Sequence, residues 1–440
     1  MSWFACPRSS LRQFCSRSSL RQFSFSFRSR FPRDLSVPQR LHNATSQSGA
    51  IPSFRAQVAR NNPVPCFVDA VKHPEIGKHI IFVFGASALV YVVAAHNTNI
   101  ETNFWATYLT GQKPWSTAVP TTLDMRFAQA QILLKKFQGQ LASLTEVLTD
   151  APIVAKSVIL HSYARLAEMY LNASEGRRAG YGIAAVNVGI WVAWQIPILR
   201  PFMMTHFTHQ PLSGKIYTML TSMFSHSSFV HLLFNCMALT SFASATSTWM
   251  TREQIQAPSH LRESTASYHF LALYLSSGLF SSFVSHLVTT RFLYPRLVSK
   301  LVQPDKTGSP GMMHKLSSSL SSAAKSSARP ATDAAAATPT ILPSLGASGA
   351  IYSTVIMSTL AFPEAEVSLV FPPTPSFPIQ YGVGGMVLLD CIGILRGWRF
   401  FDHYAHLGGA AFGALYYMYG MSMWDAVRVH TLKSDTRRKV

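Results

Sequence analysis

The stretch Gly346-Ala347-Ser348-Gly349 decides how this chain is understood, because it places a hydroxyl at the head of an apolar run that extends to Phe362. A second stretch, Ala405-His406-Leu407-Gly408-Gly409, opens another apolar run that continues to about Met421. Serine and histidine inside such runs are costly in a membrane and usually have a polar function. The two stretches therefore supply a nucleophile and a base at membrane depth, which indicates a protease working inside a bilayer.

The composition predicts a polytopic membrane protein. Of the 440 residues, 48% are hydrophobic and only 13% are charged. Several uncharged apolar runs have about 18 to 25 residues, the length needed to cross a hydrocarbon core of roughly 30 Å. We expect an all-α membrane protein with spans at about 79–96, 181–199, 228–248, 266–290, 346–362, 379–395 and 403–421. The run 346–362 is short for a span, which suggests a helix that begins below the membrane surface.

The N-terminal segment 1–62 explains about half of the net charge of +19. It carries ten Arg, no Lys and a single acid, Asp34, among many serines. An Arg-rich, Ser-rich, acid-poor N-terminus is typical of a mitochondrial targeting presequence. The alternative is a disordered basic tail. Because the charge is concentrated here, it does not predict a nucleic-acid partner.

The remaining chain divides into three regions. Residues 63–180 form an N-terminal region with one span and, from about Thr122 to Leu171, two helices expected to be soluble or to lie at the membrane interface. Residues 181–425 form the core, with a low-complexity insert at about 316–340. Residues 426–440 are a basic C-terminal tail. The five cysteines show no metal-ligand spacing, so no disulfide framework, metal site or cofactor is expected.

Ser348 is the candidate nucleophile. Gly346 and Gly349 would leave room for a substrate backbone, and a helix start offers unpaired N–H groups to a developing oxyanion. The alternative is that these small residues only allow two helices to approach closely.

His406 is the candidate general base. Gly409 and Gly413, four residues apart, form a small-residue seam that would let this helix pack against the helix carrying Ser348. The two side chains could then form a hydrogen bond, as nucleophilic catalysis requires. A histidine that is merely satisfied by packing is the alternative.

His231 and Asn235 lie four residues apart, on one face of a helix. They are candidate donors to the oxyanion, or they could bond to each other structurally. His226 is interpreted as a loop-ordering or water-holding residue. Asp390 is the one clear acid within the six core spans and is expected to lie far below His406, as a helix-packing or hydrogen-bonding group. Asp402 and His403 could order the start of the helix that carries His406.

These motifs resemble the signature set of the rhomboid intramembrane serine proteases. The run from Gly397 through Trp398, Asp402 and His403 to Gly409 is similar more specifically to the mitochondrial, presenilin-associated-rhomboid-like branch. The resemblance implies six core helices plus one N-terminal helix and a Ser–His dyad without a third acidic member. It also implies a multi-pass protein of the mitochondrial inner membrane. Its expected partners are the lipid bilayer and single-pass transmembrane substrates, including imported proteins such as a dynamin-like GTPase that it would mature.

Two other functions remain open on the sequence alone. One is a catalytically inactive, rhomboid-like binding protein, which should have lost Ser348 or His406. The other is a polytopic transporter, which should show internal repeats of spans with interrupted helices.

Overall fold

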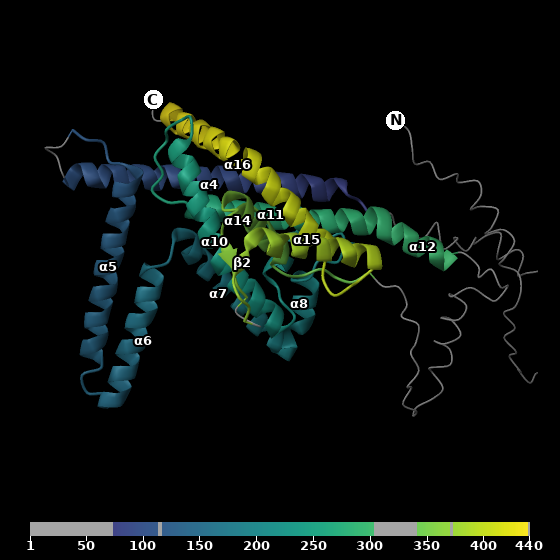
Figure 1. The fold of residues 1–440 in the computed structure, drawn as a ribbon, viewed down its shortest axis with the longest axis horizontal. Coiled ribbons are helices and arrows are strands. Elements are labelled where there is room, and N and C mark those ends of the chain that lie inside the picture. The colour runs from purple at the N-terminus through teal and green to yellow at the C-terminus, as the bar shows by residue number, and fades with distance from the viewer. Residues whose placement is uncertain (1–73, 113–116, 303–340, 370–372, 439–440) are drawn as a thin grey trace, which may run out of the picture. The chain divides into compact units, whose positions relative to one another are not determined.

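The computed structural model describes residues 74–112, 117–302, 341–369 and 373–438. The predicted presequence and the low-complexity insert at 316–340 lie outside these residues. Within the described part the protein is mostly helical, and six of the seven apolar runs lie largely within one helix each (Figure 1). The run 181–199 instead crosses a break at Ile196, where the helix ends and the chain bends by 98°. The helices of the seven runs are α4 (Gly77–Gln112), α7 (Glu175–Gln195), α10 (Phe229–Gln256), α11 (Ser267–Val288), α14 (Ser348–Ala361), α15 (Ile379–Arg396) and α16 (His403–Arg438).

Shorter elements connect the long helices. Between α4 and α7 lie α5 (Thr122–Val147) and α6 (Ile153–Leu171). The link from α7 to α10 contains η1 (Pro197–Leu199), α8 (Arg200–His206), α9 (Thr218–Thr221) and η2 (Ser222–Phe224), and α11 continues through η3 (Thr289–Leu293) into α12 (Tyr294–Val302). The proline-rich link after α14 is extended, as its prolines predict. It forms a two-stranded antiparallel ribbon of β1 (Glu366–Val367) and β2 (Phe377–Pro378).

Four of the described helices are long and apolar enough to cross a membrane: α4, α10, α11 with its continuation to Ser299, and α15. A fifth span results if α7 and the segment Pro197–His206, which are bent by 98° relative to each other, count as one. Helix α14 has only 14 residues, and α16 is not among the candidates by length and composition. The structure thus supports a polytopic helical protein, while the count of six core spans plus one stays a prediction.

Helix α14 lies at the centre of the core, where it packs against α16, α10 and α11. Apolar side chains such as Leu239, Phe270, Leu273 and Met357 are fully buried there. Several buried hydroxyls on these helices bond to carbonyls one turn earlier, for example Ser281 to Ser277 and Ser358 to Thr354. This pairing satisfies groups that would otherwise be costly away from water.

Helix α16 extends beyond the boundary expected at residue 425. It is helical to Arg438, and Trp424 and Arg428 are completely buried. Arg428 donates from Nε to Asn99 Oδ1 at 3.0 Å and from Nη2 to the Arg262 carbonyl at 2.8 Å. Part of the expected basic tail is therefore a structural element that ties α16 to α4 and to the α10–α11 link. Burial of this basic side chain is offset by the bonds of Nε and Nη2, although Nη1 has no hydrogen-bond partner among the described residues.

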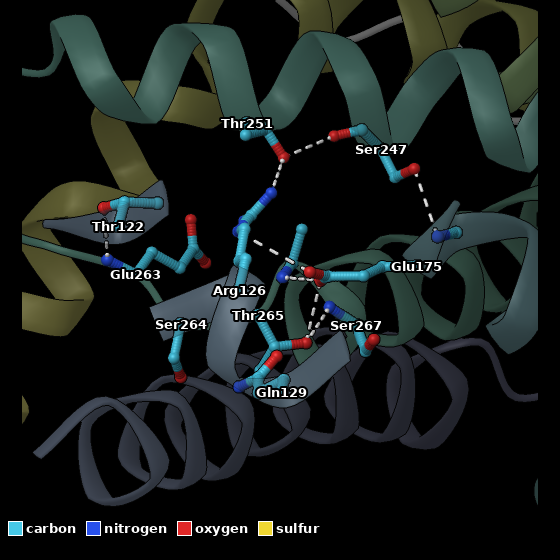
Figure 2. Close-up of polar contacts among 12 residues, drawn as sticks. Thr122, Arg126, Gln129, Glu175, Ser247, Thr251, Glu263, Ser264, Thr265 and Ser267 are labelled. Atoms are coloured by element: carbon cyan, nitrogen blue, oxygen red, sulfur yellow. Dashed lines mark hydrogen bonds and ion pairs between the residues drawn. The ribbon is translucent and has the colours of Figure 1, made fainter. Parts of the chain in front are cut away.

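Polar contacts fix the base of the α5–α6 pair to the core, at the end of α10 that is remote from His231 (Figure 2). Arg126 of α5 donates from Nη1 to Thr251 Oγ1 at 2.9 Å and lies 3.5 Å from Glu175 Oε1 of α7. The backbone N–H of Glu263 donates to Thr122 Oγ1 at 3.2 Å. Three helices and the α10–α11 link therefore meet at one buried polar junction.

Glu263 at this junction generates a test of stability. Its carboxyl is fully buried, and burial raises its pKa to about 7, although the nearby Arg428 and Arg126 act in the opposite direction. The folded protein thus holds this proton more tightly than the unfolded chain, so stability is lost as pH rises through about 7. We expect Glu263→Gln in detergent to flatten the fall in melting temperature between about pH 5 and pH 8. Glu146→Gln, at an exposed position, serves as the control, and an unchanged slope in Glu263→Gln would refute this account.

Candidate active site

Ser348 is the first residue of α14, and the backbone before it is shaped by Gly346. Gly346 has φ +129°, a conformation that other residues rarely adopt. A Cβ at this position would also lie 2.8 Å from Cε1 of His231. Glycine therefore allows the chain to turn into α14 beside the His231 ring. The first N–H groups of the helix, at Ser348 and Gly349, have no intrahelical acceptor and are available to a ligand.

The structure brings His406 to Ser348, as the sequence predicts. His406 Nε2 lies 2.8 Å from Ser348 Oγ, although 58 residues separate them in the chain. The His406 ring stacks on Tyr352 of α14 with a centroid distance of 4.7 Å and an interplanar angle of 12°. The packing of the ring thus fixes the direction of its nitrogens.

Asp402 caps the helix that carries His406, in agreement with the sequence interpretation. Its carboxylate accepts from the Ala405 N–H at 3.0 Å, from Ser344 Oγ at 2.6 Å and from Ser285 Oγ at 2.7 Å. These bonds join the start of α16 to α11 and to the segment that leads into α14. They fix the start of α16, which carries His406, relative to the segment that leads to Ser348.

The expectation that Asp390 lies far below His406 is wrong. Asp390 Oδ1 lies 3.1 Å from His406 Nδ1 and 2.5 Å from His403 Nδ1, and its Oδ2 accepts from the Tyr352 hydroxyl. The physical reason is the register of two antiparallel helices. Gly393 of α15 lies directly against the His403 ring, where a Cβ would be 2.4 Å from its Nε2. Asp390 lies one turn before Gly393 on α15, and His406 lies one turn after His403 on α16. Because the helices are antiparallel, Asp390 therefore meets His406.

The glycine seam between α14 and α16 is also present. A Cβ at Gly409 would lie 2.0 Å from the Gly349 carbonyl oxygen, and one at Gly413 would lie 2.5 Å from that of Ser353. A Cβ at Gly349 would in turn meet Ser281 of α11 at 2.6 Å. The backbones thus approach more closely than any larger residue allows.

The three polar residues before and within α10 lie differently from one another. His231 lines the cavity in front of Ser348. Asn235 is buried, and its amide donates to the His231 carbonyl at 2.8 Å, so its role as an oxyanion donor stays a prediction. His226 is buried with Nε2 facing the Ala347 N–H at 3.5 Å. Burial, followed by the nearby His231, lowers the pKa of His226 to about 4, so the ring is neutral and can accept this bond.

A cavity of about 770 Å³ opens in front of the Ser348–His406 pair. Its lining combines polar groups with the aromatic residues of the α15–α16 link, among them His231, Ser285, Ser348, Trp398, Phe400, Phe401, His403 and His406. A smaller space of about 20 Å³ adjoins Ser348 on the side of Ser222, Ser281 and Ser282. Serine hydroxyls and apolar side chains line this space together, and it is large enough for one water molecule. The site can therefore admit an extended peptide and a water.

Among the described residues, Asp390, His403 and His406 form a group whose potential metal-ligand atoms lie within 4.8 Å of one another. In the structure these atoms bond to each other and to Tyr352. A metal ion on His406 Nδ1 would displace the bond to Asp390. The prediction that the site needs no metal is compatible with this geometry and stays a prediction.

The arrangement is suited to nucleophilic catalysis. A serine hydroxyl bonds to an imidazole nitrogen, the other nitrogen faces a carboxylate, and helix N–H groups lie beside the hydroxyl. Acyl transfer needs this combination of nucleophile, base, orienting group and oxyanion donors. Sequence reasoning named Asp390 but misplaced it, although the rarity of acids in the spans was a signal for a function. It missed Tyr352, whose hydroxyl bonds to Asp390 and whose ring stacks on His406.

Comparison with known proteins agrees with this geometry. The rhomboid domain family matches residues 213–294 and 307–423. The chain is 32% identical over 248 residues to presenilin-associated rhomboid-like protein A, mitochondrial, of Danio rerio, which covers 56% of this chain and 49% of that protein. It is 32% identical over 250 residues to presenilin-associated rhomboid-like protein, mitochondrial, of Homo sapiens, covering 57% and 50%. It is 25% identical over 259 residues to rhomboid protein 1, mitochondrial, of Saccharomyces cerevisiae, covering 58% and 57%. The chain spans about half the length of the curated relatives it matches.

The glycine seam generates a test of how the site is assembled. In Gly409→Ala the added methyl must push α16 away from the Gly349 carbonyl, so we expect a loss of about 1–3 kcal/mol in stability. The melting temperature in detergent measures this loss. Gly182→Ala is the matched control, because a Cβ at that helical position meets nothing within 4 Å. Equal melting temperatures for the two variants would contradict the close approach described here.

Proposed function

Because the chain carries a rhomboid domain, we propose that it is an intramembrane serine protease of the mitochondrial inner membrane. It cleaves peptide bonds in or near the transmembrane segments of single-pass substrates. The observation that carries the proposal is the 2.8 Å contact between Ser348 Oγ and His406 Nε2, two side chains from different helices that meet beside a cavity.

The first chemical step is attack by Ser348. His406 Nε2 accepts the hydroxyl proton as Oγ attacks the substrate carbonyl carbon. The resulting oxyanion is stabilised by the N–H groups at the start of α14 and by His231. Asn235 could join them only if its amide left the His231 carbonyl. His406 then returns the proton to the leaving amine, and the substrate remains bound to Ser348 as an ester.

The second step is hydrolysis of this ester. A water from the small, serine-lined space beside Ser348 loses a proton to His406 and attacks the acyl carbon. Ser348 leaves with a proton from the same ring, which restores the starting state. The side chains present are sufficient for both steps.

Asp390 contributes by orienting His406. Its carboxylate accepts from Nδ1–H, so the lone pair is on Nε2, toward Ser348. It also stabilises the imidazolium that forms while the ring holds the proton. We therefore propose a Ser–His–Asp arrangement in place of the dyad that the family resemblance implied.

The proposed substrates follow from the cavity and from the relatives. A cavity with polar and aromatic walls at membrane depth suits a local unwinding of a substrate helix, whose exposed backbone can then reach Ser348. We propose that the substrates are imported mitochondrial membrane proteins, such as a dynamin-like GTPase, which the enzyme matures. The two alternatives are less well supported. An inactive relative would not need Ser348 and His406 in bonding contact, and the sequence shows no repeat of spans typical of a transporter.

The pair of reacting groups is tested by Ser348→Ala and His406→Ala. Each should abolish cleavage of a transmembrane substrate in detergent or liposomes, and the double variant should be no worse, because the two groups act as one unit. All three should retain the melting behaviour of a folded protein. Appreciable cleavage by Ser348→Ala would rule out the mechanism.

The orienting role is tested by Asp390→Asn, which keeps the shape of the side chain. An amide can present its N–H to Nδ1 and favour the wrong tautomer, so kcat should fall by about 10²–10⁴-fold with little change in KM. Asp402→Asn, which alters the helix-capping residue, is the comparison, because it should lower stability more than it alters the chemical step. Turnover within about twofold of the natural chain in Asp390→Asn would leave the dyad as the better description.

A further inference from the structure

His403 is a buried histidine that the proposed cleavage steps do not use. The residue is 3% exposed, and its Nε2 has no hydrogen-bond partner among the described residues. A buried nitrogen without a partner is costly. The ring packs against the backbone of α15 at Gly393, where a Cβ would lie 2.4 Å from this Nε2. What the ring contributes to the fold or to function therefore lies on its other side, at Nδ1.

The Nδ1 atoms of two histidines meet at one carboxylate. His403 and His406 are three residues apart on α16, so their rings lie on the same side of the helix. Nδ1 of His403 lies 2.5 Å from Asp390 Oδ1, and Nδ1 of His406 lies 3.1 Å from the same oxygen. Imidazole and carboxylate groups that project from facing helices are the ligands of many metal sites in helical bundles. The cluster therefore has the donor set of a metal site.

The spacing of these atoms suits a small transition-metal ion. The three potential ligand atoms lie within 4.8 Å of one another. Around a tetrahedral Zn²⁺ with bonds of about 2.0–2.1 Å, neighbouring ligand atoms are about 3.3 Å apart. Shifts of about 1–1.5 Å would thus bring the three groups onto an ion. Two nitrogens and one carboxylate oxygen match the ligands of Zn²⁺, whereas Mg²⁺ and Ca²⁺ prefer oxygen ligands alone.

The cluster borders the large cavity. His403 and His406 both line the space of about 770 Å³ in front of Ser348. An ion that enters this cavity from water thus lies beside the two rings whose Nδ1 atoms face Asp390. A water molecule in the cavity can supply the fourth ligand of a tetrahedral ion, as in zinc sites with three protein ligands.

We propose that Asp390, His403 and His406 form a Zn²⁺ site whose occupation switches the proposed protease off. The neutral His406 ring has one proton, which it donates from Nδ1 to Asp390. Zn²⁺ on Nδ1 takes the place of this proton, which moves to Nε2. Nε2 then donates to Ser348 Oγ and can no longer accept the hydroxyl proton. The inhibition rests on the proposed protease function, whereas the binding of the metal does not.

Metal binding is tested first, with Co²⁺ as a probe that absorbs visible light strongly in a tetrahedral site. The full-length chain is purified in detergent without a polyhistidine tag and titrated with Co²⁺, and Zn²⁺ should displace the signal. His403→Asn keeps an N–H toward Asp390 but removes a ligand, so its affinity should fall at least about tenfold, since even losses around the ligands cost this much. Asp390→Asn should lose the signal as well. His161→Asn, which removes an exposed histidine of α6, is the matched control. Only variants that keep the melting temperature of the natural chain are compared.

Inhibition is tested on cleavage of a transmembrane substrate. Saturating Zn²⁺ should lower turnover by about 10²-fold or more, the contribution of a general base, and a chelator should restore it. Mg²⁺ should have no effect. Whatever its own rate, His403→Asn should need at least about ten times more Zn²⁺ for half inhibition. Co²⁺ affinity that is equal in His403→Asn, Asp390→Asn and the natural chain would overturn the site, and Zn²⁺ that binds through His403 without slowing cleavage would overturn the switch. A chain that binds Co²⁺ through His403 but cleaves nothing would overturn the protease function and support the metal site.

Discussion

The close approach of α14 and α16 is the constraint on which the rest of the site depends. Ser348 and His406 belong to different helices, and their side chains are short, so the helix axes must come unusually near for Oγ and Nε2 to meet at 2.8 Å. Gly409 and Gly413 remove the side chains that would prevent this approach. The same contact places Tyr352 flat against the His406 ring. Backbone proximity, nucleophile activation and ring orientation thus share one cause.

Much of this could be predicted from the sequence, because each signal was local. A histidine and a serine in apolar runs are conspicuous, and glycines four residues apart on a helix mark the side that packs closely. The apolar runs also indicated where seven of the described helices lie, since the length of such a run is a direct consequence of bilayer thickness. The capping role of Asp402 followed from its place just before a helix start.

The features that the sequence did not reveal depend on how elements pack against each other. The contact between Asp390 and His406 requires the register of α15 against α16, which is set by the fit of Gly393 to His403 and by a six-residue link. Likewise, α16 continues past residue 425 because Arg428 finds partners on α4 and on the α10–α11 link. The amide of Asn235 turns to its own helix, although its position on α10 was predicted correctly. For Asp390 and Arg428 the bonding partners lie far apart in sequence, whereas Asn235 bonds to a carbonyl of its own helix in place of a ligand in the cavity.

The brevity of α14 affects how the protein relates to the lipid around it. Fourteen residues rise about 21 Å, roughly 9 Å less than the hydrocarbon core of an average bilayer. A bilayer adjusts to a short apolar element by thinning next to it, at a modest cost per ångström. The bent pair of α7 and α8 can accommodate such thinning because the segment Pro197–His206 turns away from the direction of α7 by 98°. Thicker membranes would then oppose the fold near Ser348, and the lipid composition of the surrounding membrane becomes a determinant of how readily the cavity fills with water.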